Sequence, residues 1–150
     1  MQLIRSLAAC LLLLTTGTVP ALAQDAASLI ALSERLQGEA EARGDMLEAG
    51  STIAAEPEDA FFADTARFSS GMRALALHID THGGPADLPC IFRGMAEDAD
   101  MRRTALEADP ASAEDYRQLA RTFSHAAIIA ADVETEGPDT GFPPSCPSAG

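Results

Sequence analysis

The residues closest to a metal motif in this sequence are His78 and His82, four positions apart. On a helix this spacing places both imidazoles on one face, where they can reach one ion. Cys90 follows after a turn, and a free thiol near a helix N-terminus would have a lowered pKa and redox reactivity. Histidines in the last turn of a helix are also favoured by the helix dipole, which is the simpler interpretation. A metal-handling or thiol-redox protein built on His78, His82 and Cys90 remains an alternative.

Two arginines fall where their helices are expected to carry apolar residues, Arg43 in the first helix and Arg102 in the third. Both lie in the C-terminal halves of helices expected to run parallel, so we expect them at one end of the fold, near Thr65 and Tyr116. Two guanidiniums and two hydroxyls can hold a small carboxylate or phosphate, in an enzyme or in a binder. Glu39 and Asp98 each stand four residues before one of these arginines, so ordinary helical ion pairs are the simpler interpretation.

Motifs for covalent catalysis or haem attachment are absent from the sequence. It contains no Gly-x-Ser-x-Gly, Ser-x-x-Lys, His-Glu-x-x-His or Cys-x-x-Cys-His segment, and it has no lysine. The third histidine, His125, projects away from the apolar stripe of its helix, which opposes axial ligation of a non-covalent haem. We therefore expect no cofactor and favour a protein without enzymatic activity.

The first 23 residues have the pattern of a cleaved export signal. Arg5 precedes an apolar run from Leu7 to Leu14, and Ala21-Leu22-Ala23 supplies small residues at the cleavage position. This run is too short for a spanning helix of about 20 residues, so we expect no membrane insertion. A lipoprotein site at Cys10 is disfavoured because the apolar run follows the cysteine instead of preceding it. We predict a mature chain that begins at Gln24 and is periplasmic or secreted.

Removal of the signal leaves two cysteines, Cys90 and Cys146. An even pair in an exported protein is most simply a disulfide, because exported chains mature in oxidising compartments. The bond closes a long loop and should stabilise the fold by about 4 kcal/mol on the chain-entropy model. It should also tether the irregular, Pro-rich tail, residues 141–150, to the rest of the chain.

Apolar residues recur at helical spacing in four stretches separated by Gly, Pro and Ser, and no stretch alternates as a strand does. We expect helices over about residues 26–47, 58–81, 89–108 and 112–133, within one domain spanning 24–140. Short connections around Gly83-Gly84-Pro85 and Asp109-Pro110-Ala111 make neighbouring helices antiparallel. The predicted fold is an all-α four-helix bundle in up-down-up-down order, although the longer link from Glu48 to Pro57 also allows a crossover.

Helical periodicity also predicts which faces of these helices are buried. In the third helix the aligned apolar residues are Leu88, Ile91, Met95, Ala99 and Leu106. The second helix aligns Phe61, Phe68, Met72, Leu75 and Ile79, and its opposite face carries the uncharged residues Ala63, Ala66, Ser70, Ala74 and Leu77. Small side chains let helices approach closely, so two copies can form a homodimer through that opposite face. A plain exposed Ala-rich face is the simpler interpretation, because alanine is the best helix former.

The chain is strongly acidic, with 23 acidic and 10 basic residues and a net charge of -13. All the acidic residues and nine of the basic ones follow residue 23, so the predicted mature chain has a charge of -14. This balance opposes binding to nucleic acid and to anionic membranes. Without a catalytic constellation, the sequence favours an exported, non-enzymatic binding or interaction module for a protein or small molecule that it does not identify.

Overall fold

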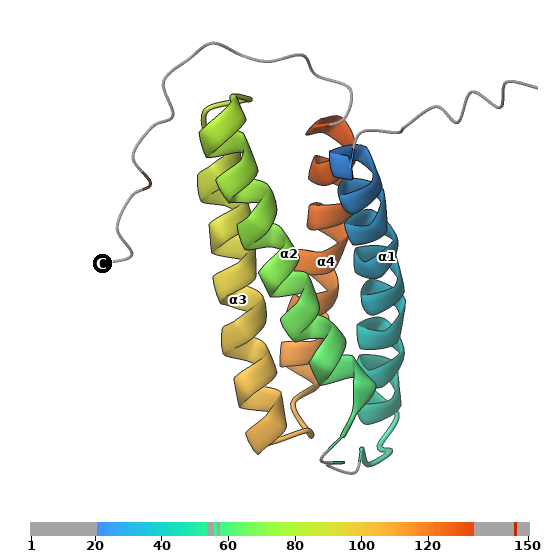
Figure 1. Cartoon of the computed structure of the whole chain (residues 1–150). Helices are drawn as coiled ribbons and strands as arrows, with labels where there is room; N and C mark the ends of the chain where they lie inside the picture. The colour runs from blue at the N-terminus through green and yellow to red at the C-terminus, as the bar shows by residue number, and fades with distance from the viewer. Residues whose placement is uncertain (1–20, 54–55, 57, 134–145, 147–150) are drawn as a thin grey trace, which may run out of the picture.

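The protein is an all-helical bundle of four antiparallel helices in up-down-up-down order, as the sequence predicts (Figure 1). The computed structural model describes residues 21–53, 56, 58–133 and 146, with side chains from Ala26 onward. Most of the predicted signal segment and most of the 141–150 tail therefore lie outside the described residues. The four helices are α1 (Ala21–Glu48), α2 (Ala60–His82), α3 (Leu88–Ala108) and α4 (Ala113–Val133).

The helices form two closely packed antiparallel pairs, α1 with α4 and α2 with α3. Narrower interfaces, α1 with α2 and α3 with α4, join the pairs into one bundle. In the described chain no Cα atoms of α1 and α3, or of α2 and α4, lie within 8 Å of each other. Each helix therefore has two neighbours, and diagonal helices face each other across the core.

Aromatic side chains from α2 and α4 fill the centre of the bundle. Phe61, Phe68, Tyr116 and Phe123 are fully buried. The rings of Phe68 and Phe123 meet edge to face with centroids 4.8 Å apart, and Phe61 contacts Phe123 in the same way at 6.4 Å. Such pairs add to the free energy gained by burying large apolar surfaces. They join the two helix pairs across the core.

The third helix buries a face shifted by one residue from the predicted one. Phe92 and Ala96 are fully buried, whereas Ile91 and Met95 are only partly buried. The shift follows from size, because burying the Phe92 ring removes more apolar surface from water than burying either Ile91 or Met95. Ala99 and Leu106 are buried as predicted, because they belong to both the predicted and the observed buried face.

Local chemistry fixes the helix ends within a few residues of the predicted bounds. Asp59 is the N-cap of α2 and accepts a hydrogen bond from the Phe61 amide at 3.0 Å. Gly83 ends the same helix with φ 92°, a conformation that favours glycine. The structure starts α1 at Ala21, five residues before the predicted start and ahead of the predicted cleavage position.

A disulfide joins Cys90, in the first turn of α3, to Cys146 of the C-terminal segment, which confirms the predicted pairing. The bond closes a stretch with a sequence separation of 56 residues. It therefore ties the described part of the tail to the α2–α3 end of the bundle. Within the described residues, no helix is long and apolar enough to cross a membrane.

Candidate functional site

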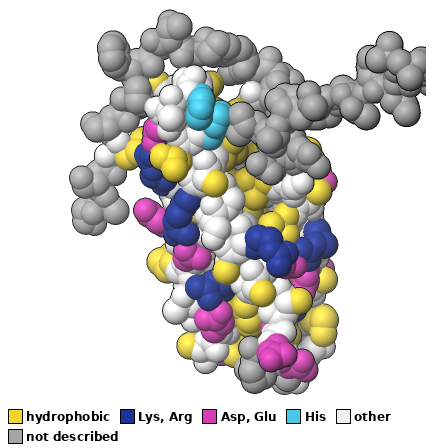
Figure 2. All heavy atoms as spheres, in the orientation of Figure 1, with side chains coloured by type: hydrophobic (Ala, Val, Ile, Leu, Met, Phe, Trp, Pro, Cys, Tyr) yellow, Lys and Arg dark blue, Asp and Glu magenta, His cyan; other side chains and the backbone are white. Residues whose placement is uncertain are grey.

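An open groove of 560 Å³ runs between α1 and α2, at the end of the bundle where α1 begins. Its apolar lining comes from both helices: Ala26, Leu29, Leu32, Gly71, Ala74 and Leu75. Figure 2 shows hydrophobic side chains in a strip along the boundary between α2 and α1. A volume of this size lies within the range of small-molecule sites, which are mostly apolar with a few polar groups.

Small residues on α2 shape this groove. Gly71 has no side chain, and a Cβ built on it would lie only 2.7 Å from a Leu29 methyl group, so the glycine lets Leu29 pack directly against α2. Ala74, one turn further along, is exposed and contributes only a methyl group to the lining. The interface of α1 with α2 is narrow, and the short side chain of Ala74 leaves apolar surface open to solvent.

Basic groups stand at one end of the groove. Arg67 lines it and is 69% exposed, with an ion pair of 2.6 Å to Asp64. Arg35 of α1 binds the other oxygen of Asp64 at 2.5 Å, so the two guanidiniums share one carboxylate. Glu39 lies 3.9 Å from Arg35 but is closer to Arg43, at 2.8 Å. Arg35 and Arg67 therefore bring two positive charges to the single carboxylate of Asp64 at this end.

His78 lines the other end of the groove and stacks on His82. Their ring centroids are 4.0 Å apart with an interplanar angle of 14°, and His82 Nδ1 lies 3.1 Å from the His78 carbonyl. A ring nitrogen binds metal in the plane of its ring, so stacked rings do not direct both nitrogens at one ion. Among the described residues no group of three or more His, Cys, Asp or Glu is arranged to hold a metal. Burial and the neighbouring His82 both lower the pKa of His78.

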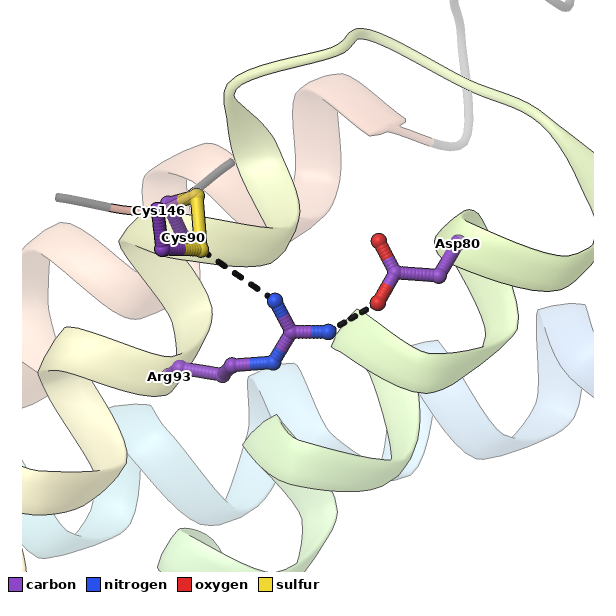
Figure 3. The surroundings of a disulfide bond; sticks show 4 residues. All are labelled: Asp80, Cys90, Arg93 and Cys146. Atoms are coloured by element: carbon purple, nitrogen blue, oxygen red, sulfur yellow. Dashed lines mark hydrogen bonds and ion pairs between the residues drawn. A yellow bond between two sulfur atoms is a disulfide. The ribbon is translucent and has the colours of Figure 1, made fainter. Parts of the chain in front are cut away.

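The disulfide lies beside the pair Arg93–Asp80 (Figure 3). Arg93 Nη1 is 3.2 Å from Cys146 Sγ, and its other terminal nitrogen binds the Asp80 carboxylate across the α2–α3 interface. Cys90 is therefore not a free thiolate in this state, and it lies on a different helix from the two histidines. The three residues of the redox alternative do not form a single site here.

Arg43 connects the end of α1 to the start of α2. Its guanidinium binds both oxygens of Asp59, at 2.6 and 2.9 Å, and Glu39 at 2.8 Å. It also lies over two aromatic rings, 4.6 Å from the Phe61 centroid and 5.9 Å from that of Tyr116. Arg43 and Tyr116 thus come together as predicted, in a cluster where carboxylates already neutralise the cation.

Arg102 is held separately, on the α3–α4 side. It binds Asp98 at 2.8 Å and Asp115 at 3.0 Å, and Thr122 donates to the second oxygen of Asp98 at 2.7 Å. Asp115 also accepts from the Ser112 hydroxyl at the start of α4. The two arginines therefore have separate carboxylate partners, and the predicted anion site through Arg43, Arg102 and Tyr116 stays a prediction.

The groove itself was not predicted from the sequence. Its signal was present in Gly71, a small residue that the periodicity places beside the apolar stripe of α2, and in Ala74 of the uncharged opposite face, one turn further along. No family model matches this sequence, and no curated protein or solved structure is significantly similar to it. Function therefore has to be inferred from the residues themselves.

Proposed function

We propose that this protein is an exported, non-enzymatic binding module whose α1–α2 groove holds an apolar guest. One observation carries the proposal: the 560 Å³ groove is lined by six apolar residues from two helices, on a chain that is otherwise strongly acidic. Contiguous exposed apolar surface on a soluble chain commonly marks an interaction or ligand site.

A neutral fluorescent probe such as phenylnaphthylamine tests the groove directly, because its emission rises in apolar surroundings. We expect the purified protein to bind the probe at micromolar concentration. Ala74→Phe fills the groove and should weaken binding at least tenfold. Ala105→Phe changes another exposed alanine, on α3 and outside the groove lining, so it is the matched control and should leave binding unchanged. Equal binding by the protein and both variants would reject the groove as the site.

Export is supported by the signal-like segment up to Ala23 and by the disulfide, which is typical of oxidising compartments. Intact-mass measurement on protein recovered outside the cytoplasm should give a chain that begins at Gln24 and is two hydrogens lighter than its reduced form. A lipidated Cys10 or an uncleaved chain would contradict this part of the proposal.

The metal or redox alternative has less support from the geometry. It needs the thiolate of Cys90, which the disulfide occupies, and convergent nitrogens of His78 and His82, which are stacked. The anion alternative needs free guanidiniums, whereas Arg43 and Arg102 are each bound by two carboxylates. The groove requires no rearrangement to accept a guest.

A further inference from the structure

We propose that the guest of the α1–α2 groove is a fatty carboxylate with one acyl chain, whose carboxylate binds Arg67. The chain then lies along the apolar lining toward His78. This inference rests on the proposed function, since it names the chemical class of the guest in the same groove.

The shape of the groove fits one acyl chain. Arg67 and His78 mark its two ends on α2, and the step of eleven positions from one to the other rises about 16 Å along the helix axis. The carbon–carbon bonds of an extended acyl chain are about 1.5 Å long but zigzag, so each carbon advances about 1.3 Å and roughly 13 carbons span that distance. The apolar lining between these ends comes from Leu29 and Leu32 on one side and Ala74 and Leu75 on the other. Methylene groups placed there are partly removed from water, which favours binding.

Charge complementarity points to a carboxylate at the Arg67 end. Within the described residues Arg67 has one ion-pair partner, Asp64, which it shares with Arg35. The 69% exposed Arg67 side chain can therefore turn a further N–H toward a ligand without breaking a buried pair. In Figure 2 basic side chains lie beside the lower end of the hydrophobic strip. A guanidinium binds a carboxylate in a fixed two-bond geometry, which a hydroxyl or ammonium head group cannot use.

The opposite end suits the uncharged tail of the guest. Ala26 is buried there, and the lowered pKa of His78 favours the neutral imidazole near pH 7. A methyl terminus can pack against both without leaving a charge unsolvated. The carboxylate and the methyl terminus of the guest therefore bind at opposite ends of the groove, which fixes the direction of its acyl chain.

Competition against phenylnaphthylamine tests this guest with three probes of equal length: dodecanoate, dodecanol and dodecyltrimethylammonium, each below its micelle concentration. We expect dodecanoate to displace the dye at about five- to tenfold lower concentration than dodecanol. This is the ratio of affinities expected from one charge-assisted hydrogen bond at an exposed site. The cationic probe should be the weakest. Raising the salt concentration should reduce the preference for dodecanoate, because the pair is exposed.

Arg67→Gln should remove the preference for dodecanoate while leaving dodecanol binding unchanged. Arg73→Gln is the matched control, because Arg73 is a half-exposed arginine of the same helix that pairs with Asp100 and does not line the groove. Equal affinities for dodecanoate and dodecanol, or equal effects of the two substitutions, would overturn the carboxylate inference and leave the groove function intact. If no probe binds, or if sedimentation shows a dimer that Ala74→Phe dissolves, both proposals fail, because a second copy then covers the groove.

Discussion

The carboxylate of Asp59 performs two tasks, because it caps the first turn of α2 and binds the Arg43 guanidinium of α1 through both oxygens. Both side chains are largely buried, with 17% of Arg43 and 13% of Asp59 exposed. The residues are sixteen positions apart, on either side of the connection between the two helices. One side chain therefore fixes both where α2 begins and how it sits against α1.

Replacing Asp59 should separate these two tasks. Asp59→Asn keeps a capping oxygen but loses the ion pair, and it should lower the free energy of unfolding by about 1 to 2 kcal/mol. Asp59→Ala also loses the cap and should lower it by about 2 to 3 kcal/mol. Urea denaturation measures both. In the background of Arg43→Met the Asn substitution should cost much less, and an unchanged cost there would show that the pair contributes nothing.

The same pair predicts how stability depends on pH. The hydrogen bonds from Arg43 are the main cause that holds the pKa of Asp59 below its usual range. Since the pKa is lower in the folded state, the contribution is fully present above the unfolded value of about 3.9. It is lost as the pH falls through the folded pKa. The stability of the protein should therefore drop more steeply below about pH 4 than that of Asp59→Asn. Parallel curves would contradict this assignment.

Tyr116→Phe should keep or raise stability. The Tyr116 ring is fully buried, and in the described part of the chain its hydroxyl has no hydrogen bond of normal geometry. Burial raises the pKa of this phenol, against the opposing effect of Arg43. An unpaired buried hydroxyl costs folding free energy, so the Phe variant should gain up to about 1 kcal/mol in thermal denaturation. A loss of more than about 1 kcal/mol would show that the hydroxyl has a partner.

The helices could be predicted from the sequence because residues that end helices stand between them and their apolar residues are regularly spaced. Gly83 and Asp109 stop helices where the pattern breaks, and the short connections leave only antiparallel neighbours. The buried face of α3 could not be predicted, because the helix carries two rows of apolar residues displaced by one position, and either could face the core. Only the packing of the whole bundle shows that Phe92 is buried in preference to Ile91.

The groove could not be predicted for a related reason. It depends on surface that α1 and α2 leave uncovered, and spacing within one helix does not show how far apart two helices lie. Gly71 and Ala74 are compatible with a tight helix contact, an exposed face or a groove. Which of these occurs depends on the narrow α1–α2 interface, a property of the whole bundle.

Zinc should bind weakly or not at all. The stacked rings of His78 and His82 do not direct two nitrogens at one ion, and the disulfide removes the Cys90 thiolate. Calorimetry on the oxidised protein should give no transition tighter than about 10 micromolar. A sub-micromolar affinity that His82→Ala abolishes would instead support a metal function.

Self-association through the Ala-rich face of α2 should be weak. This face, defined by Ala63, Ala66, Ser70, Ala74 and Leu77, is exposed apart from the partly buried Ala66, and Leu77 is 63% exposed. The net charge opposes association, and one exposed leucine offers little apolar area. Sedimentation at about 0.15 M salt should show a monomer at all concentrations. A dimer that Ala63→Glu/Ser70→Glu dissolves would establish the interface; this double variant leaves the groove intact.

The disulfide should open in one direction during exchange with glutathione. The glutathione thiolate can attack Cys90 and release the Cys146 thiolate, or attack Cys146 and release that of Cys90. Arg93 lies 3.2 Å from the Cys146 sulfur, so this partly exposed guanidinium can stabilise a negative charge there, although Asp80 neutralises part of its charge. We therefore expect attack at Cys90, which leaves glutathione bound to Cys90 and a free thiolate at Cys146.

Acid quenching, alkylation and peptide mapping identify which cysteine carries glutathione early in the reaction. Most of the mixed disulfide should be on Cys90. Arg93→Gln should slow the reaction and reduce that preference, because the leaving thiolate loses its cation. Asp80→Asn should act in the opposite sense, since Asp80 neutralises part of the Arg93 charge across the α2–α3 interface. Glutathione found mainly on Cys146, or a product ratio that neither substitution changes, would show that Arg93 does not direct the exchange.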